Sequence, residues 1–166
     1  EVLRTEGVRH VFGNPGSTEL PLIDALADAD DVHYVLALQE ATVVGMADGF
    51  AQMSGNAAFV NLHSSAGTGH ALGNIFTAFR NQTPMVITAG QQARSMITMQ
   101  ANLTNRDATR VPHPFVKRSF EVPRAEDGHY YLTLQVNGTP VVFLADTGAS
   151  NMVLSREDAR RLGIDP

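Results

Sequence analysis

The sequence predicts an α/β fold: an open parallel sheet with helices on both faces over residues 1 to about 120, followed by a short antiparallel β-hairpin and a helix. Two observations predict it. Apolar runs alternate with helical patterns up to about residue 90, the order typical of a parallel sheet. After residue 120 the pattern changes to period-2 alternation around Asn137-Gly138, the strongest short hairpin signal. We therefore expect two domains, residues 1–120 and 121–166.

Bulk composition limits the classes of protein that remain. The 166 residues are 43% hydrophobic and 17% charged, with a net charge of −5, which is typical of a globular protein with one good core or two small ones. The chain is mildly acidic, so its composition does not indicate the basic surface that binds nucleic acid. No apolar run approaches the roughly 20 residues of a membrane span. The absence of cysteine excludes disulfides and cysteine-based metal sites.

Four apolar runs in the first part have the length and continuous character of strands that are buried on both faces. We expect strands over residues 8–12, 32–38, 57–62 and 84–89. The stretches around them are typical of helices. We expect helices over residues 2–7, from Ser17 as N-cap, over 40–54, from the small-residue loop 64–69 to about 80, and within 91–102. This order places the four strands in one parallel sheet.

The hairpin and helix of the second part follow a different pattern. Residues 130–136 and 139–145 alternate on either side of the turn. Residues 155–163 have the pattern of a capped helix, with Ser155 as N-cap, acids in the first turn, arginines in the last and Gly163 as the stop. We expect an antiparallel pair of strands followed by one helix.

Three polar residues stand at the carboxyl ends of successive predicted strands. Ser17 follows the first strand, Glu40 the second and His63 the third. In an open α/β sheet these ends meet at one edge, where ligands bind. Each residue also has a structural interpretation: Ser17 as a helix N-cap, Glu40 as a first-turn acid that stabilises the helix dipole, and His63 as a structural histidine. Three such residues from three strands favour a site.

Residues 1 to about 120 resemble the N-terminal, pyrimidine-binding domain of thiamine diphosphate-dependent enzymes, most closely those of the benzoylformate decarboxylase type. Five blocks in order carry the resemblance, at the spacing of the family. They are Val11 to Ser17, Leu36 to Ala41, Asn61 to Ser64, Ala66 to Gly69, and Ile87 to Gln92.

The resemblance implies roles for the residues at the strand ends. Glu40 would be the acid that hydrogen-bonds the aminopyrimidine ring of thiamine diphosphate and so activates the cofactor. His63 would transfer protons, and Ser17 would hold the substrate carboxylate. Asn14, Pro15 and Gly16 would join Glu40 in binding the cofactor. The implied reaction is the non-oxidative decarboxylation of an aromatic 2-keto acid to an aldehyde.

The chain also departs from the family pattern. His70 stands where the family commonly has Asn, and Arg110 to His113 differ from a segment that holds a structural cation, so we expect no metal ligands in this chain. The Mg²⁺- and diphosphate-binding domain of the family is not in the sequence. The family's cofactor normally bridges two subunits, so the resemblance implies a homo-oligomer and half a site in residues 1–120.

Asp146-Thr147-Gly148 closes the second strand of the hairpin, and Met152-Val153-Leu154 follows it. With this context, residues 121–166 resemble the N-terminal part of retropepsin-like bacterial aspartic proteases, in which two subunits each supply one such loop. The resemblance implies that Asp146 is a catalytic acid that shares a proton with its counterpart and activates water. The structural alternative is an aspartate in an ordinary turn.

Two resemblances, each incomplete, indicate a chimera of two enzyme fragments that we expect to be inactive alone. Two alternatives stay open: an aspartic protease fragment with an unrelated N-terminal part, and a non-catalytic interaction module. We expect a small-molecule 2-keto acid as the partner of the first part, and neither nucleic acid nor membrane. No signal peptide is visible. We expect a cytoplasmic location, although the protease-like part leaves export open.

Overall fold

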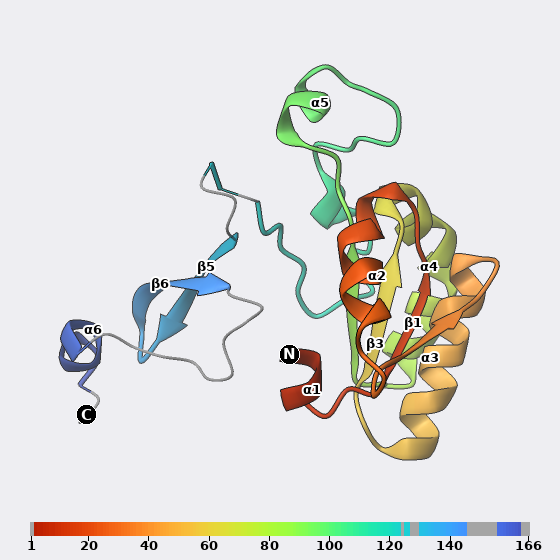
Figure 1. Cartoon of the computed structure of the whole chain (residues 1–166), viewed down its shortest axis with the longest axis horizontal. Coiled ribbons are helices and arrows are strands. Elements are labelled where there is room, and N and C mark those ends of the chain that lie inside the picture. Colours follow the sequence, from red (N-terminus) through yellow and green to blue (C-terminus); the bar gives the residue numbers. More distant parts are fainter. Residues whose placement is uncertain (1, 124, 127–129, 146–155, 164–166) are drawn as a thin grey trace. The chain divides into compact units, whose positions relative to one another are not determined.

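The computed structural model describes residues 2–123, 125–126, 130–145 and 156–163 (Figure 1). It divides into two compact units. One unit comprises Gly7–Phe120, and the other comprises residues 1–6 and 121–166.

The larger unit is built on a parallel sheet of four strands in the order β2-β1-β3-β4. The strands are β1 (His10–Asn14), β2 (His33–Leu36), β3 (Ala58–Leu62) and β4 (Met85–Ala89). The predicted α/β fold class is therefore confirmed. The first strand starts two residues later than the sequence predicts, because its pairing with β2 begins at His10 and its pairing with β3 continues to Asn14.

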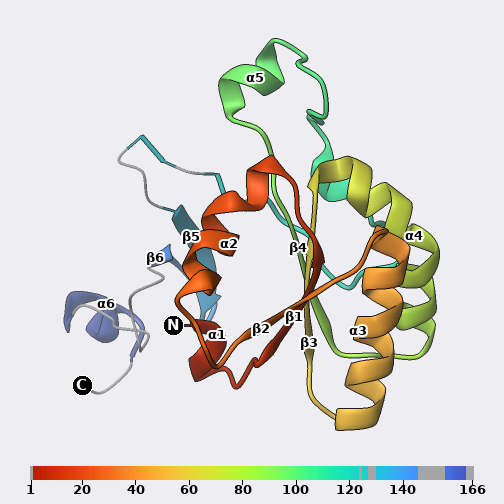
Figure 2. The same ribbon diagram turned by 45° about the vertical axis from the view of Figure 1, so that its right-hand side comes forward.

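Helices cover the two faces of this sheet unequally. After β1 come a 3-10 turn η1 (Ser17–Glu19) and α2 (Leu20–Ala27), while α3 (Glu40–Ser54) and α4 (Ser64–Arg80) complete the later connections. Figure 2 shows α2 on one face and α3 beside α4 on the other. This follows from right-handed crossovers, because the connection from β1 to β2 runs in the opposite direction along the sheet to those that follow.

The apolar core lies between the sheet and the pair α3 and α4. Phe12, Val60 and Leu62 project from the strands toward buried residues of α3 such as Val43 and Val44. Further buried members are Ala37, Ala47, Ala51, Ala58, Ala71 and Ile75. On the opposite sheet face, α2 buries none of its residues. The apolar core cluster therefore lies on the face that α3 and α4 cover, and the other face also carries polar groups.

Two helix starts differ from the sequence prediction. Gly16, rather than Ser17, is the N-cap residue, and Ser17 is the first residue of η1. The small-residue stretch 64–69 forms the first turns of α4, not a loop before it. Thr68 donates a hydrogen bond to the carbonyl of Ser64 at 3.0 Å, which satisfies its side chain inside the helix. Gly55, with φ of +72°, ends α3 as expected.

The segment after β4 is mostly irregular but returns to the core. It contains α5 (Arg94–Thr98) and a 3-10 turn η2 (Ala108–Arg110), so the helix expected within 91–102 is much shorter. Phe115 and Val116 pack against the core cluster, and the Phe115 ring meets Phe76 of α4 edge-on with centroids 4.9 Å apart. These contacts explain why the larger unit extends to Phe120.

The smaller unit contains α1 (Val2–Thr5), β5 (Tyr130–Val136), β6 (Thr139–Ala145) and α6 (Arg156–Arg161). The strands pair antiparallel from Tyr130 opposite Ala145 to Val136 opposite Thr139. Asn137 and Gly138 have φ of +50° and +77°, the left-handed values that a tight hairpin turn needs. The hairpin is therefore confirmed. Asp146 to Ser155 lie outside the described residues.

None of the helices in the described ranges is long and apolar enough to cross a membrane.

Candidate functional site

The order of the strands locates the candidate site. The chain steps from β1 to β2 on one side and from β3 to β4 on the other, so the direction reverses between β1 and β3. Crevices at such a switch point, beyond the carboxyl ends of the strands, are where open α/β sheets bind ligands. The turn η1 follows β1, and His63 follows β3. The residues after these two strands are therefore brought to one edge.

His63 is held at this edge by Glu19 of η1. The Nδ1 atom of His63 lies 2.7 Å from Oε2 of Glu19 and 3.1 Å from the hydroxyl of Thr18. The next residue, Ser64, is fully buried and has φ of +56°, a left-handed conformation that is costly for a residue with a side chain. The hydrogen bond and this backbone conformation together fix the direction of the imidazole.

Glu19 is 2% exposed, and both oxygens of its carboxylate accept hydrogen bonds. The backbone N–H of Gly16 donates to Oε2 at 2.8 Å, and that of Gly90 donates to Oε1 at 3.0 Å. The Thr18 hydroxyl also donates to Oε1, at 2.6 Å. These three donors and the Nδ1 atom of His63 come from the ends of three strands and converge on one buried carboxylate, which compensates for the cost of burying it.

Two glycines leave the room that this arrangement needs. A Cβ atom on Gly16 would lie 2.3 Å from Nδ1 of His63, and one on Gly90 would lie 2.1 Å from Oε1 of Glu19. Both distances are far below van der Waals contact. The site is therefore built around glycine at positions 16 and 90.

A row of polar side chains crosses the sheet on the same side as η1. The Tyr34 hydroxyl donates to Oδ1 of Asn61 at 3.3 Å, and Nδ2 of Asn61 donates to the Thr88 hydroxyl at 3.2 Å. Gly13 lies beneath, where a Cβ would be 1.8 Å from the Tyr34 oxygen. Burial, and next the negative charge of Glu19, raises the pKa of Tyr34 to about 12. Tyr34 therefore remains a neutral donor beside the carboxylate.

Glu40 is the first residue of α3 and follows the carboxyl end of β2 after three residues, because β2 ends at Leu36 rather than at the predicted residue 38. Its side chain is 14% exposed, and Oε2 lies 3.2 Å from Nδ1 of His70 on α4. The carboxylate leans on the first turns of α4, where a Cβ on Gly67 would lie 3.1 Å from Oε1. Leu36 and Leu38, which precede Glu40 in the chain, are 60% and 94% exposed. The segment before Glu40 therefore exposes two apolar side chains.

The structure brings together only some of the residues that the sequence predicts for the site. His63 and Gly16 are in close contact, whereas Ser17 is exposed at the start of η1. Asn14 ends β1 and is half-buried together with Pro15. In the contacts between described residues, Glu40 bonds to His70, and none joins it to His63 or Ser17. Asp146 lies outside the described residues.

Sequence reasoning missed Glu19 and gave no contact for His70. A signal for Glu19 was present: a glutamate three residues after the cap position is the second half of a capping box, and Glu19 does accept from the Gly16 N–H. Nothing local indicates that this acid also reaches Gly90, 71 positions later. His70 stands where the family commonly has Asn, but the residue that it contacts depends on how α3 packs on α4.

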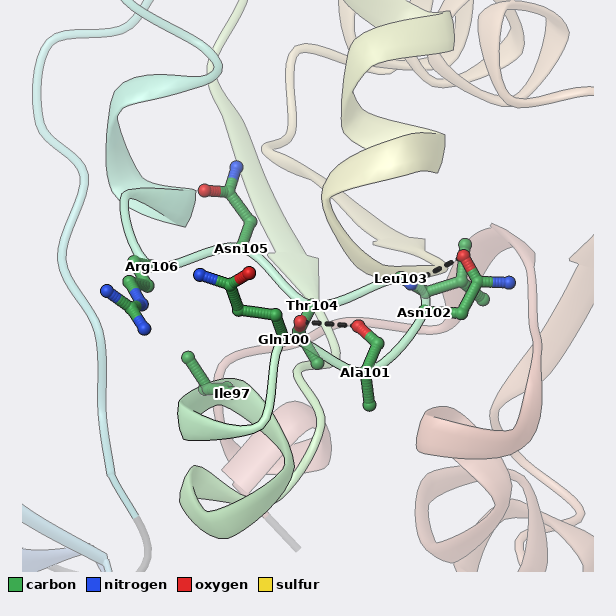
Figure 3. Close-up of a pocket in the computed structure, with 8 residues that line it drawn as sticks. All are labelled: Ile97, Gln100, Ala101, Asn102, Leu103, Thr104, Asn105 and Arg106. Atoms are coloured by element: carbon green, nitrogen blue, oxygen red, sulfur yellow. Dashed lines mark hydrogen bonds between the residues drawn. The ribbon is translucent and has the colours of Figure 1, made fainter.

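A hollow of about 410 Å³ lies in the loop after α5, away from these residues in the sequence (Figure 3). Residues from Ile97 to Arg106 line it, and it contains none of the residues expected in the site. In the part of the chain that the structure describes, no group of three or more His, Asp or Glu side chains is placed to hold a metal ion.

Residues 1–110 match the family model of the thiamine pyrophosphate enzymes, N-terminal TPP binding domain. The chain belongs to this family. A second model, aspartyl protease, matches residues 132–166.

Two named relatives show which enzymes of the family the chain is similar to. The chain is similar to benzoylformate decarboxylase of Pseudomonas aeruginosa, 53% identical over 127 residues, which is 76% of this chain and 24% of that protein. It is also similar to the acetolactate synthase large subunit of Haemophilus influenzae, 38% identical over 125 residues, covering 75% and 22%. The chain thus spans about a quarter of the length of these relatives.

The chain is also similar to solved structures of thiamine diphosphate-dependent enzymes. Benzoylformate decarboxylase from Polynucleobacter necessarius matches with a TM-score of 0.70 and 48% identity, over 76% of this chain and 23% of that one. The thiamine diphosphate-dependent 4-hydroxybenzoylformate decarboxylase of Rhodococcus jostii matches with a TM-score of 0.66 and 45% identity, over 69% and 21%. The parallel sheet and its helices are therefore those of the family's N-terminal domain.

Proposed function

We propose that residues 1–120 form the pyrimidine-binding part of a thiamine diphosphate-dependent decarboxylase that acts on an aromatic 2-keto acid. The observation that carries this is the largely buried Glu40 carboxylate at the carboxyl edge of the sheet, in a chain 53% identical to a benzoylformate decarboxylase. The identity to an acetolactate synthase subunit is 38%, so synthesis of acetolactate is the second candidate.

The surroundings of Glu40 fit an aminopyrimidine ring. The carboxylate can bond a ring nitrogen, and the exposed side chains of Leu36 and Leu38 would offer apolar surface to the ring face. When bound, the cofactor supplies the carbanion-stabilising chemistry that decarboxylation requires. Glu40 would hold the ring and exchange a proton with it, and its burial strengthens that hydrogen bond by lowering the local dielectric.

The remaining residues at the edge would act on the substrate and the cofactor. His63 lies at the switch point with one ring nitrogen bound to Glu19, so its other nitrogen is the atom that would take or give a proton. Ser17 is exposed at the start of η1, where its hydroxyl would bond the substrate carboxylate. Asn14, Pro15 and Gly16 would line the cofactor on the β1 side. Any Mg²⁺ would be held with the diphosphate, outside residues 1–120.

A hybrid enzyme tests the proposal. Residues 1–110 of this chain would replace the matching segment of the Pseudomonas aeruginosa benzoylformate decarboxylase, with thiamine diphosphate and Mg²⁺ added. We expect benzaldehyde from benzoylformate, and a loss of about 10²- to 10⁴-fold in kcat for Glu40→Gln, the usual range for a group that transfers protons. Asp24→Asn, on the exposed face of α2, is the matched control.

The outcomes separate the two candidates. A folded hybrid that forms acetolactate and no benzaldehyde favours the synthase. A folded hybrid with neither activity contradicts both. Because the isolated chain spans about a quarter of its relatives, we expect no decarboxylation from it alone.

We propose separately that residues 121–166 derive from an aspartic protease, so that the chain joins parts of two enzyme families. The support is the protease model over residues 132–166 and the hairpin that leads into Asp146. Paired loops from two subunits would be needed for catalysis, and a homo-oligomer would be needed by both parts. Peptide cleavage that pepstatin inhibits and Asp146→Asn abolishes would show that this part is active, whereas we expect no cleavage from this chain.

A further inference from the structure

Glu19 has features that separate it from an ordinary structural acid. It is 2% exposed, it accepts hydrogen bonds from two backbone N–H groups and from the Thr18 hydroxyl, and its Oε2 atom lies 2.7 Å from Nδ1 of His63. A backbone N–H can only donate. An amide NH₂ in place of either oxygen would bring two hydrogens face to face, so this network selects a carboxyl group over an amide.

The same network determines which nitrogen of His63 carries the proton. An ionised carboxylate only accepts, so the 2.7 Å contact between Oε2 of Glu19 and Nδ1 of His63 requires a hydrogen on Nδ1. The Thr18 hydroxyl hydrogen points to Oε1 of Glu19, at 2.6 Å, and is not available to donate to His63. A neutral His63 then has its lone pair on Nε2.

We propose that Glu19 is a positioning residue that holds His63 with the proton on Nδ1 and thereby presents Nε2 as the nitrogen that exchanges protons at the site. This inference rests on the proposed function for the role of His63. In the forward step Nε2 takes a proton and the ring becomes an imidazolium beside the Glu19 carboxylate. In the reverse step Nε2 returns that proton, and Nδ1 keeps its own throughout.

The glycines support this assignment. A Cβ on Gly16 would overlap the imidazole, at 2.3 Å from Nδ1 and 2.4 Å from Cε1, and a Cβ on Gly90 would overlap Oε1 of Glu19. No Cβ atom therefore projects from Gly16 toward the His63 ring or from Gly90 toward the Glu19 carboxylate. Glycine at both positions is thus what permits the observed contact between His63 and Glu19.

The tautomer can be measured directly on the full 166-residue chain, without cofactor or substrate. Two-bond ¹H–¹⁵N correlation spectra of the six histidines, recorded well above their titration midpoints, distinguish Nδ1–H from Nε2–H rings. His63→Gln assigns the signal. We expect Nδ1–H for wild type. Glu19→Gln offers the ring both a carbonyl oxygen and an NH₂ group and weakens the bond, so the ratio of Nδ1–H to Nε2–H should fall by about tenfold or more.

Two further variants keep the test decisive if Glu19→Gln is too unstable to study. Thr18→Val removes a hydroxyl near Nδ1 but leaves the carboxylate, so the Nδ1–H form should persist. Gly16→Ala displaces the ring from Glu19 and should lower the Nδ1–H fraction. An Nε2–H ring in the wild type, or an unchanged ratio in folded Glu19→Gln, would overturn the assignment.

The result is separable from the proposed function. An Nε2–H ring together with an active hybrid enzyme overturns the role of Glu19 alone. An Nδ1–H ring together with an inactive hybrid supports the role of Glu19 and counts against the proposed decarboxylase.

Discussion

At the scale of single residues, the polar face of the sheet is organised around one buried carboxylate. Glu19 accepts from Gly16 and Gly90 on different oxygens, so an amide in its place faces an N–H whichever way it turns. We expect Glu19→Gln to lower the free energy of unfolding by about 1–3 kcal/mol, the cost of one unsatisfied buried donor. Urea denaturation measures it. The exposed acid Asp24 provides the control, since Asp24→Asn should change stability by less than about 0.5 kcal/mol.

Tyr34 makes the stability of the folded chain depend on pH in the alkaline range. Its pKa of about 12 in the folded chain exceeds the ordinary value of 10.0, so the unfolded state loses the phenol proton first. Above pH 10 the unfolded state therefore binds fewer protons, and stability falls until about pH 12. Below pH 10 the contribution is complete.

Tyr34→Phe should remove this fall in stability between pH 10 and about pH 12. The variant also loses the hydrogen bond to Asn61, so we expect it to be less stable at neutral pH. Urea midpoints measured across the alkaline range for both proteins test it. A variant that loses stability as steeply as wild type between pH 10 and 12 would rule out Tyr34 as the source.

Sequence reasoning reached the edge of the sheet but not its contacts. Placing Ser17, Glu40 and His63 after successive strands needed only hydrophobic pattern, because the ends of parallel strands must meet. Which of them touch depends on side-chain packing. Glu19 looks like any first-turn acid until Gly90 is brought beside it, and no local pattern encodes that pairing.

At the scale of elements, α4 contains a matched pair of glycines. A Cβ on Gly73 would meet nothing within 4 Å outside the backbone of its own helix, whereas a Cβ on Gly67 would lie 3.1 Å from Glu40. Gly73→Ala should stabilise the chain by about 0.5–1 kcal/mol, as alanine does inside a helix. Gly67→Ala should gain less or lose stability, because Glu40 must move. Thermal unfolding compares them, and equal gains would show that Glu40 does not depend on Gly67.

The elements themselves were largely predictable, and their ends were not. Each strand was evident from its apolar run, and the hairpin from Asn137-Gly138. The start of β1 was misplaced because backbone pairing with β2 and β3, not residue type, decides where a strand begins. The stretch 64–69 was mistaken for a loop because its glycines weaken a helix, although Gly67 is needed there to admit Glu40.

At the scale of the whole molecule, we propose that the two units unfold independently. Asp48 is 8% exposed in α3 and accepts hydrogen bonds from Asn81 at 2.9 Å and from Thr83. Asp48→Ala leaves these groups without their acceptor, and we expect a loss of about 1–3 kcal/mol confined to the larger unit. Hydrogen exchange should become faster in β1 to β4 and remain unchanged in β5 and β6. Equally accelerated exchange in the hairpin would mean that the units unfold together.

The bond between Glu19 and the N–H of Gly90 also has a consequence for how the chain acquires its site. The two partners are 71 positions apart, and β3 with His63 lies between them in the sequence. Closing so long a loop is slow and entropically costly, and local contacts form earlier. During synthesis, η1 and His63 leave the ribosome well before Gly90 does. The final orientation of His63 is therefore a late event of folding, completed only when β4 joins the sheet.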